Sequence, residues 1–246
     1  MEYLKSYILI ILRVFLFFKY YLIERFYFKR KHFNCSIASQ IYSKGFYLFD
    51  EVMEGEKIEL LAYDFESALR SNKLKTGGQE NNRLQANGIV RPILNAYLDE
   101  IKPILDDYFG SDGWKVEISY YQRSIPEADI DNVPGGEFHV DDNKSNLKYF
   151  IYLDEVTSLN GPFSCVPMTH QWRLKNSFMR GLHWAVFQER KSLYSLGIDQ
   201  SRYEKIEYYF VGPSGTHFIV DTTALHRARP VAEGQRRVVV MSFNRR

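Results

Sequence analysis

The stretch EFHVDD at residues 137–142 carries the side chains in this sequence that are best suited to chemistry. It follows a Pro-Gly-Gly turn, and a strand is predicted to begin at this point. Side chains alternate between the two faces of a strand, so His139 and Asp141 point the same way while Val140 points to the other side. An imidazole and a carboxylate would therefore converge on one point, as two ligands of a metal ion do.

Two protein ligands are too few to hold a catalytic transition metal well, so we expect a third among the other histidines. His226 is the best candidate, because it follows the turn-like Asp-Thr-Thr at 221–223 and precedes another strand, which places it at the mouth of a barrel. Two histidines and one carboxylate on one face of an iron ion leave three positions for a bidentate co-substrate and oxygen. That geometry suits a non-heme iron(II) oxygenase. The other histidines are His32 in a basic segment, His170 in a turn where backbone groups are its expected partners, His183 in a predicted helix, and His217 at the start of a strand.

An arginine near the end of the chain indicates how a co-substrate would be held. Arg237 lies 11 positions after His226 (237 − 226 = 11), just before the apolar residues 238–243. A buried guanidinium needs an anionic partner, and its shape suits a carboxylate gripped through two hydrogen bonds. The distal carboxylate of 2-oxoglutarate would be such a partner. Arg236 is the rival, because adjacent strand residues face opposite sides and only one of the two can face inward.

A longer pattern surrounds these residues. In chain order it comprises HVD at 139–141, LKYFIYL at 147–153, NGPF at 160–163, VPMTH at 166–170, His226 and Arg237. Together these stretches resemble the phytanoyl-CoA dioxygenase-like family of Fe(II)- and 2-oxoglutarate-dependent oxygenases, over about residues 115–243. The resemblance implies a double-stranded β-helix (jelly roll), iron bound by His139, Asp141 and His226, and 2-oxoglutarate bound by Arg237.

The same resemblance implies the reaction. 2-Oxoglutarate and O2 would be consumed, succinate and CO2 released, and a substrate carbon hydroxylated, with ascorbate as the reductant. Asp141 favours hydroxylation, since related halogenases lack the carboxylate to make room for halide. Asp142 is predicted to face away from the site.

Further residues are candidates for the pocket or depart from the family pattern. Lys148 and Tyr152 are predicted to contact the co-substrate, and Tyr121 and Arg123 are further pocket candidates. Ordinary filling of the barrel is the alternative for all four. The departures are Met168, where the family's turn usually has Gly, and Ala228, where relatives carry a hydroxyl residue that helps the arginine.

The elements that must position these side chains are helices first and short strands afterwards. The sequence predicts a short strand over 45–49, a helix over 57–74, an exposed polar loop over 73–88, and a helix over 91–109 that Pro103 bends or breaks. Strands are predicted over 114–122, 147–153, 162–166, 215–220 and 237–243. This order favours an α+β domain built around a jelly roll, with flanking helices.

Composition narrows the class of protein. With 45% hydrophobic residues among 246, the chain has ample apolar surface for one main core. Lys and Arg number 32 against 30 Asp and Glu, which is too balanced for the dense basic face of a nucleic-acid-binding protein. Cys35 and Cys165 lie far apart, so neither a disulfide framework nor a zinc finger is indicated, and a reducing compartment fits best.

The first 34 residues form a separate unit in this interpretation, and residues 35–246 form the oxygenase domain. Residues 7–23 are apolar and aromatic but contain Arg13 and Lys19, which makes them a marginal spanning helix. The basic residues that follow, up to Lys31, favour the cytoplasmic side or an anionic lipid surface. Packing of this helix on the domain's own sheet is the main alternative, and a cleaved signal peptide is disfavoured because charges interrupt the apolar run.

The sequence therefore predicts an Fe(II)- and 2-oxoglutarate-dependent dioxygenase that hydroxylates a small molecule, a lipid or a lipid-linked saccharide. It is expected in the cytoplasm, with residues 3–31 as a candidate membrane-surface segment. A non-catalytic jelly-roll module that binds a carbohydrate or a protein is the alternative, and a metal-dependent isomerase or hydrolase on a similar barrel is a third reading.

Overall fold

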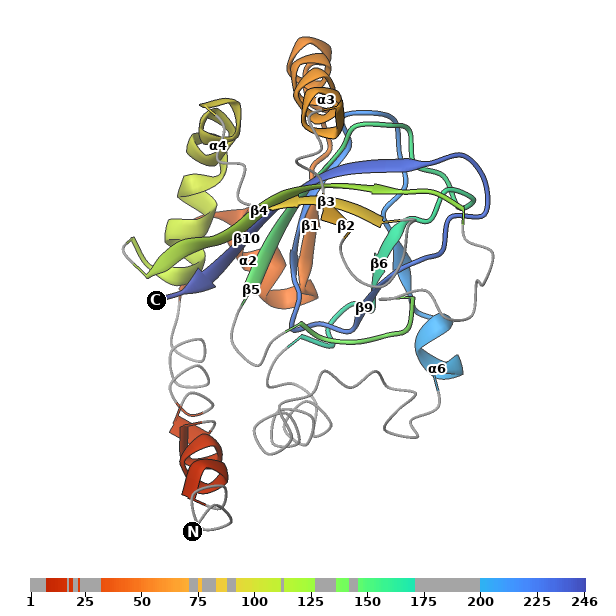
Figure 1. Ribbon diagram of the computed structural model, residues 1–246. Coiled ribbons are helices and arrows are strands. Elements are labelled where there is room, and N and C mark those ends of the chain that lie inside the picture. The colour runs from red at the N-terminus through yellow and green to blue at the C-terminus, as the bar shows by residue number, and fades with distance from the viewer. Residues whose placement is uncertain are drawn as a thin grey trace.

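A computed structural model describes residues 8–16, 18–19, 22, 32–70, 75–76, 83–87, 92–111, 113–126, 136–141, 146–170 and 200–246. In this part of the chain two antiparallel sheets lie against each other, and helices cover the outer face of the larger one (Figure 1). This arrangement of antiparallel sheets and covering helices confirms the predicted α+β class.

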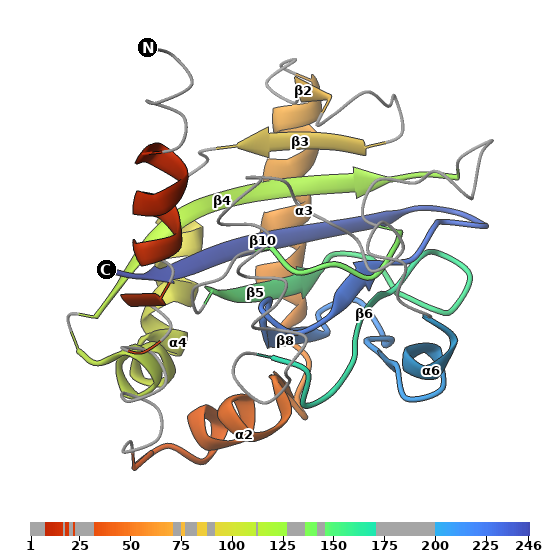
Figure 2. The ribbon, with the colours of Figure 1, turned by 90° about the horizontal axis from the view of Figure 1, so that it is seen from below.

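The larger sheet has seven strands in the order β1-β8-β5-β10-β4-β3-β2. Figure 2 shows how β10 runs through the middle of this sheet between β4 and β5. Its strands are β1 (Phe46–Leu48), β2 (Lys75–Thr76), β3 (Arg83–Asn87), β4 (Trp114–Ser124), β5 (Asn146–Tyr152), β8 (His217–Asp221) and β10 (Arg236–Arg245). The smaller sheet has the order β7-β6-β9, formed by β7 (Tyr208–Tyr209), β6 (Phe163–Cys165) and β9 (His226–Ala228).

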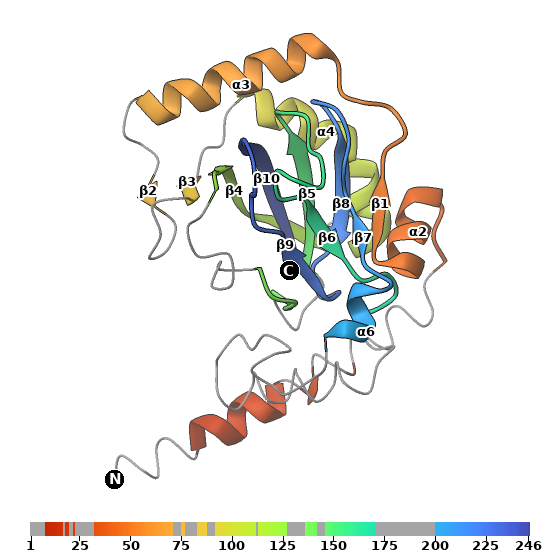
Figure 3. The same ribbon diagram turned by 90° about the vertical axis from the view of Figure 1, so that its right-hand side faces the viewer.

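Helices α3 (Gly55–Arg70) and α4 (Pro92–Phe109) lie on the side of the larger sheet that faces away from the smaller one (Figure 3). Helix α2 (Ser36–Lys44) lies beside β1, and the single turn α6 (Ser201–Glu204) lies near the smaller sheet. The amphipathic pattern of α3 explains its position, because Ile58, Leu61 and Phe65 recur at helical spacing on its buried face.

Strand alternation gives the larger sheet two different faces. Odd-numbered residues such as Tyr121, Ile151 and Val239 pack with the helices in the main hydrophobic cluster. Even-numbered residues such as Phe150 and Val238 point toward the smaller sheet, where they form a second cluster. Paired residues of antiparallel strands share a face, so the register of β10 with β4 and β5 determines which side chains line the space between the sheets.

The predicted strands 45–49, 114–122, 147–153, 162–166, 215–220 and 237–243 all correspond to observed strands, with ends shifted by up to two residues. The loop predicted over 73–88 is wrong in part, because β2 and β3 lie within it and extend the sheet beyond β4. Helix α4 continues through Pro103 without a break. Burial of Ile101, Ile104 and Leu105 offsets the backbone hydrogen bond that proline cannot donate.

Residues 8–16 are helical, and Figures 1 and 3 show them at the periphery of the fold. Eight large apolar side chains among the described residues of this segment are exposed to solvent, with exposed fractions between 41% and 67%. They are Ile8, Leu9, Ile11, Leu12, Phe15, Leu16, Phe18 and Leu22. The expected packing of this helix on the domain's own sheet is therefore not seen for these side chains. None of the helices in the described residues is both long enough and apolar enough to cross a membrane.

Candidate metal centre

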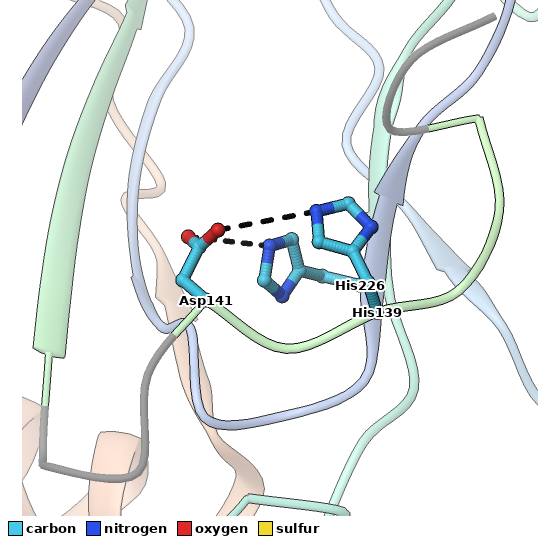
Figure 4. A group of neighbouring side chains, drawn as sticks. All are labelled: His139, Asp141 and His226. Carbon is cyan, nitrogen blue, oxygen red and sulfur yellow. Dashed lines mark ion pairs between the residues drawn. The ribbon is translucent and has the colours of Figure 1, made fainter. Parts of the chain in front are cut away.

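Three potential metal ligands converge between the two sheets, at the edge of β9 (Figure 4). His226 is the first residue of β9, and it exchanges two backbone hydrogen bonds of 3.0 Å with His139. This pair is an isolated bridge, so the strand predicted to begin near His139 is reduced to a single point of pairing. Asp141 is held by its backbone N–H, which donates to the Thr222 carbonyl at 3.1 Å. The turn before His226 and the segment after His139 thus support each other.

The spacing of the ligand atoms suits one ion. Asp141 Oδ1 lies 3.9 Å from His139 Nε2, and Asp141 Oδ2 lies 3.4 Å from His226 Nε2. All three ligand atoms lie within 4.8 Å of one another. Two ligands at about 2.1 Å from one ion are about 3 Å apart when they occupy adjacent positions, so small side-chain adjustments would bring these atoms into coordination.

Backbone carbonyls determine which ring nitrogens face the centre. His139 Nδ1 lies 2.7 Å from the Glu137 carbonyl oxygen, and His226 Nδ1 lies 2.9 Å from the Ala224 carbonyl oxygen. A carbonyl only accepts hydrogen bonds, so both Nδ1 atoms carry the proton and both Nε2 lone pairs are directed at the site. Metal-binding histidines in proteins are oriented in this way.

The charge states agree with metal binding. Burial, followed by the electrostatic effect of the neighbouring His226, lowers the pKa of His139 to about 3, so this ring is neutral at physiological pH. Burial alone would raise the pKa of Asp141, but His226 and Lys148 hold it well below its usual value. Neutral imidazole and ionised carboxylate are the forms that coordinate a metal. The donor set therefore fits a divalent transition metal such as iron.

His139, Asp141 and His226 line a cavity of about 160 Å³ between the sheets. Besides the ligands, its lining comprises Tyr120, Gln122, Lys148, Phe150, Tyr152, Phe163, Ala228, Arg236, Val238 and Val240. Phe163 also stacks on the His226 ring, with 5.4 Å between the ring centroids. The lining combines apolar and aromatic side chains with polar and charged groups in about equal measure.

The two adjacent arginines lie on opposite sides of β10. Arg236 is 3% exposed, lines the cavity and donates to the Ser124 hydroxyl at 3.4 Å. Arg237 points to the helix side instead, where it pairs with Asp154 at 2.6 Å and with Glu66 at 2.8 Å. The prediction that Arg237 faces the cavity is thus corrected in favour of Arg236, because the pairing Arg236↔Ser124 places the even-numbered residues inside.

The other pocket candidates divide in the same way. Lys148 and Tyr152 line the cavity. Lys148 Nζ contacts Asp141 Oδ2 at 2.6 Å, and the Tyr152 hydroxyl donates to the Phe210 carbonyl and accepts the Phe163 N–H, each at 3.1 Å. Tyr121 is buried on the helix side, where its hydroxyl donates to Asp64, and Arg123 is outside the cavity lining. Tyr121 and Arg123 are odd-numbered residues of β4, so they lie on the opposite face of the strand from the cavity-lining Tyr120 and Gln122.

The other histidines that the structure describes do not line the cavity. His170 is buried, with Nε2 2.6 Å from the Tyr42 carbonyl oxygen. His217 begins β8 and lies on the helix side, 2.8 Å from the Tyr149 hydroxyl and stacked on Phe49. His32 is exposed. His183 and Asp142 lie outside the described residues.

The turn that departs from the family pattern keeps the conformation that glycine favours. Met168 has a φ of 62°, and its backbone N–H donates to the Lys44 carbonyl at 2.7 Å. A left-handed backbone is costly for a residue with a Cβ, so methionine here accepts strain where glycine would have none. No residue of this turn, 166–170, is among the residues that line the cavity.

Sequence reasoning missed Gln122 of β4, which lines the cavity, and its neighbour Ser124 on the same face of the strand. Gln122 donates to the Ser124 hydroxyl at 3.1 Å, and that hydroxyl also accepts from Arg236. These amide and hydroxyl groups therefore lie beside the buried guanidinium. Ala228, which lacks the expected hydroxyl, also lines the cavity. The alternation of β4 could have indicated residues 120, 122 and 124, had its register with β10 been known.

The chain matches no family model and no curated protein at the level of sequence. Solved structures with the same fold are non-heme, 2-oxoglutarate-dependent or iron-binding proteins. One is the α-ketoglutarate-dependent carbocyclase SnoK from nogalamycin biosynthesis, at 13% identity, a TM-score of 0.61, and coverage of 87% of this chain and 86% of that one. Another is HygX from Streptomyces hygroscopicus with nickel and 2-oxoglutarate bound, at 14% identity, a TM-score of 0.55, and coverage of 84% and 86%. A third is EctD from S. alaskensis with bound Fe, at 14% identity, a TM-score of 0.59, and coverage of 87% and 80%.

At these identities the likenesses show the fold alone, which this chain shares with these solved structures. The narrower phytanoyl-CoA dioxygenase-like family is not identified by them, because no family model matches.

Proposed function

We propose that this protein is an Fe(II)- and 2-oxoglutarate-dependent oxygenase acting on a small molecule. The observation that carries the proposal is the pair of histidines whose Nδ1 protons are bound by carbonyls, so that both Nε2 atoms meet Asp141 in one cavity. This donor set occupies one face of an ion and leaves the other face for a co-substrate and oxygen. Solved structures with this fold, HygX with nickel and 2-oxoglutarate bound and EctD with bound Fe, support the same cofactors.

Arg236 is the proposed anchor of the co-substrate. Its guanidinium is nearly inaccessible to bulk solvent and lies in the same cavity as the metal ligands. A carboxylate is the natural partner for a buried guanidinium, because two parallel hydrogen bonds then satisfy both groups. Gln122 and Ser124 lie beside it and supply further hydrogen bonds, in place of the hydroxyl that Ala228 lacks.

The remaining cavity residues prepare the site. Lys148 orients Asp141 and keeps it ionised through the 2.6 Å contact, while its predicted contact with 2-oxoglutarate stays a prediction. Burial raises the pKa of Tyr152 to about 12, so its hydroxyl stays protonated and holds the backbone at Phe163 and Phe210. The chemistry supplied by the bound iron would be oxidative decarboxylation of 2-oxoglutarate coupled to oxidation of a substrate carbon, with ascorbate maintaining the reduced metal.

Hydroxylation is the outcome we propose, because Asp141 retains the carboxylate that occupies a metal position. The fold also hosts a carbocyclase and an epimerase, SnoK and SnoN of nogalamycin biosynthesis, so the outcome must be tested with substrate. Small molecules fit this proposal, since the structures of SnoN and HygX were obtained with nogalamycin RO and hygromycin B. The assignment to the phytanoyl-CoA dioxygenase-like family is part of the same proposal.

The test is succinate formation by purified protein with Fe(II), ascorbate, O2 and 2-oxoglutarate, compared with the His139→Ala variant. Slow turnover without substrate is expected for the wild type and none for the variant. Calorimetric titration of Fe(II) under anaerobic conditions and then of 2-oxoglutarate accompanies the assay. Failure of the wild type to bind either ligand would refute the oxygenase and favour a non-catalytic binding module, and metal binding without 2-oxoglutarate binding would favour an isomerase or hydrolase.

We also propose that residues 3–31 lie on the cytoplasmic face of an anionic membrane, and that residues 35–246 form the catalytic domain. The exposed apolar side chains of the helix at 8–16 support this, since a contiguous apolar surface in water is unfavourable. Arg25, Lys29, Arg30 and Lys31 supply a charge that complements anionic lipid. A lipid or lipid-linked substrate would then be met at the surface.

Flotation with vesicles tests the membrane proposal. The wild type should bind vesicles that contain phosphatidylglycerol more tightly than pure phosphatidylcholine, and the variant Ile11→Asp/Phe15→Asp should remain in solution. Equal behaviour of wild type and variant would contradict the proposal, and self-association of the vesicle-free wild type, lost in the variant, would assign the helix to contacts between copies of the chain.

A further inference from the structure

An ion network lies on the outer face of the smaller sheet, behind the metal ligands, and none of the steps above uses it. Arg227 binds Glu207 through two nitrogens, with Nε at 2.8 Å from Oε1 and Nη2 at 2.6 Å from Oε2. The Glu207 side chain is fully buried, and Ser164 and Arg229 also donate to it. Glu204 of α6 lies 3.3 Å from Arg227. Arg227 is thus held rigidly in a largely buried position.

The Arg227 guanidinium also contacts the segment that carries the other two ligands. Its central carbon lies 4.1 Å from the centre of the Phe138 ring, which is fully buried. A guanidinium over an aromatic face is attractive, and the attraction grows when both groups are shielded from water. Val166, Tyr203 and Leu225 surround Phe138 and complete this small cluster.

The sequence positions give this contact its significance. Phe138 immediately precedes His139, and Arg227 immediately follows His226. The two histidines form the bridge that joins the segments, so their neighbours project from the opposite side of the backbone. The metal ligands therefore face the cavity, while Phe138 and Arg227 face each other behind them.

Within the described residues this segment has little regular backbone pairing. Its backbone is tied to the rest by the His139–His226 pair and by the hydrogen bond from Asp141 to Thr222. No regular strand contains residues 136–141. A ligand segment with so little backbone pairing depends on side-chain packing for its position, and metal sites require ligand positions within about 0.5 Å.

We propose that Arg227 is a positioning residue for the metal centre, which fixes the separation of His139 and His226 from behind through its contacts with Phe138 and Glu207. This inference rests on the proposed metal site, but not on the identity of the co-substrate. Replacement of groups that orient metal ligands typically lowers metal affinity 10- to 100-fold. These contacts of Arg227 with Phe138 and Glu207 are called the clamp. We expect the metal affinity to fall by this factor when the clamp is removed.

The test compares two arginine networks of similar kind. Arg227→Met/Glu207→Gln removes the clamp without leaving a buried carboxylate opposite a missing cation. Arg237→Met/Asp154→Asn is the matched control, because it removes an arginine–carboxylate pair of 2.6 Å on the other face of the larger sheet, away from the ligands. Calorimetric titration of each folded protein with Co(II) alone gives the dissociation constant, and the visible spectrum of bound Co(II) reports its coordination geometry.

The clamp variant should bind Co(II) 10- to 100-fold more weakly than the wild type, with an altered spectrum. The control substitutions should change the dissociation constant of Co(II) less than twofold, even if they lower the melting temperature as much as the clamp substitutions do. Equal Co(II) affinity and an unchanged spectrum in the clamp variant would overturn the proposal and leave Arg227 a purely structural residue.

Phe138→Leu provides an independent variant that keeps the cluster apolar and removes the aromatic face. If Phe138 and Arg227 act together, combining their substitutions should weaken Co(II) binding little more than the stronger single change does. Fully additive losses would contradict a shared clamp. A wild type that binds Co(II) but not 2-oxoglutarate would refute the oxygenase and leave this inference intact, whereas a wild type without metal affinity would refute both.

Discussion

Replacement of Arg236 by Gln should abolish the recognition of 2-oxoglutarate, whereas replacement of Arg237 by Gln should not. Arg236 is 3% exposed in the cavity, while Arg237 is already paired with Asp154 and Glu66 on the helix side. Removing one partner of a buried, hydrogen-bonded charge pair costs about 2–5 kcal/mol. At about 1.4 kcal/mol per factor of ten, the dissociation constant of 2-oxoglutarate should rise from about 30-fold to several thousand-fold.

The effect that we expect from Arg237→Gln is instead a loss of protein stability. Arg237→Gln leaves two carboxylates without their cation, at the cost of about 1–3 kcal/mol, because the Arg237 side chain is only 18% exposed. A protein of this size loses about 2–4 °C in melting temperature per kcal/mol. The melting temperature of Arg237→Gln should therefore fall by about 2–12 °C, while its affinity for 2-oxoglutarate stays within twofold of the wild type.

The assay is anaerobic calorimetric titration of the metal-loaded proteins with 2-oxoglutarate and with 2-oxopentanoate, which has the same chain length and no distal carboxylate. The wild type should prefer 2-oxoglutarate strongly, and Arg236→Gln should bind the two compounds almost equally. Arg236→Lys, which keeps the charge but loses the planar fork, should fall between them. If Arg237→Gln erased the preference while Arg236→Gln retained it, the register argument would be refuted.

Three further predictions concern the metal site and its support. Ni(II) at 100 times its dissociation constant should stabilise the wild type by about 2.7 kcal/mol in thermal unfolding and leave His139→Ala unchanged, and a rise in both would place the metal elsewhere. The pKa of His139 is lowered to about 3 in the folded state from a value near 6.5 in the unfolded state, so protons bind the unfolded chain preferentially between these values and stability falls as the pH is lowered through this range. Urea unfolding of the metal-free protein should lose about 2 kcal/mol between pH 7 and pH 5 from this one group, and a His139→Gln variant with the same pH dependence would contradict the assignment. Tyr108→Phe removes the buried hydrogen bond of 2.8 Å to Asp221 at the turn before His226, and should cost about 1.5–3 kcal/mol in the same experiment, while no loss would mean that the carboxylate finds another donor.

Most elements of this fold could be predicted because their signals are local. Alternating and β-branched runs marked every strand of the larger sheet except β2 and β3, whose polar sequences gave the pattern of a loop. Those two strands form by pairing with β4, and a polar segment at a sheet edge carries little periodicity to report that pairing. Helix α4 was predicted in full, but its passage through Pro103 depended on core packing that the local sequence does not contain.

The metal ligands were accessible to sequence reasoning for a similar reason. His139 and Asp141 are two residues apart, so any extended backbone directs both to one side. His226 was chosen from its position after a turn, although its distance from the other two ligands depends on a backbone bridge across 87 residues (226 − 139 = 87). The ring orientations set by the Glu137 and Ala224 carbonyls carried no sequence signal.

What the sequence by itself determined is the set of reactive side chains, their close spacings and the period of each element, since all of these depend on neighbours a few residues away. What only the tertiary structure decided is the face on which each strand residue lies. The pairing of Arg236 with Ser124 sends Arg236, Gln122 and Tyr120 into the cavity and sends Arg237 and Tyr121 to the helices. Because side chains alternate with a period of two, a register difference of a single residue exchanges the two sets completely.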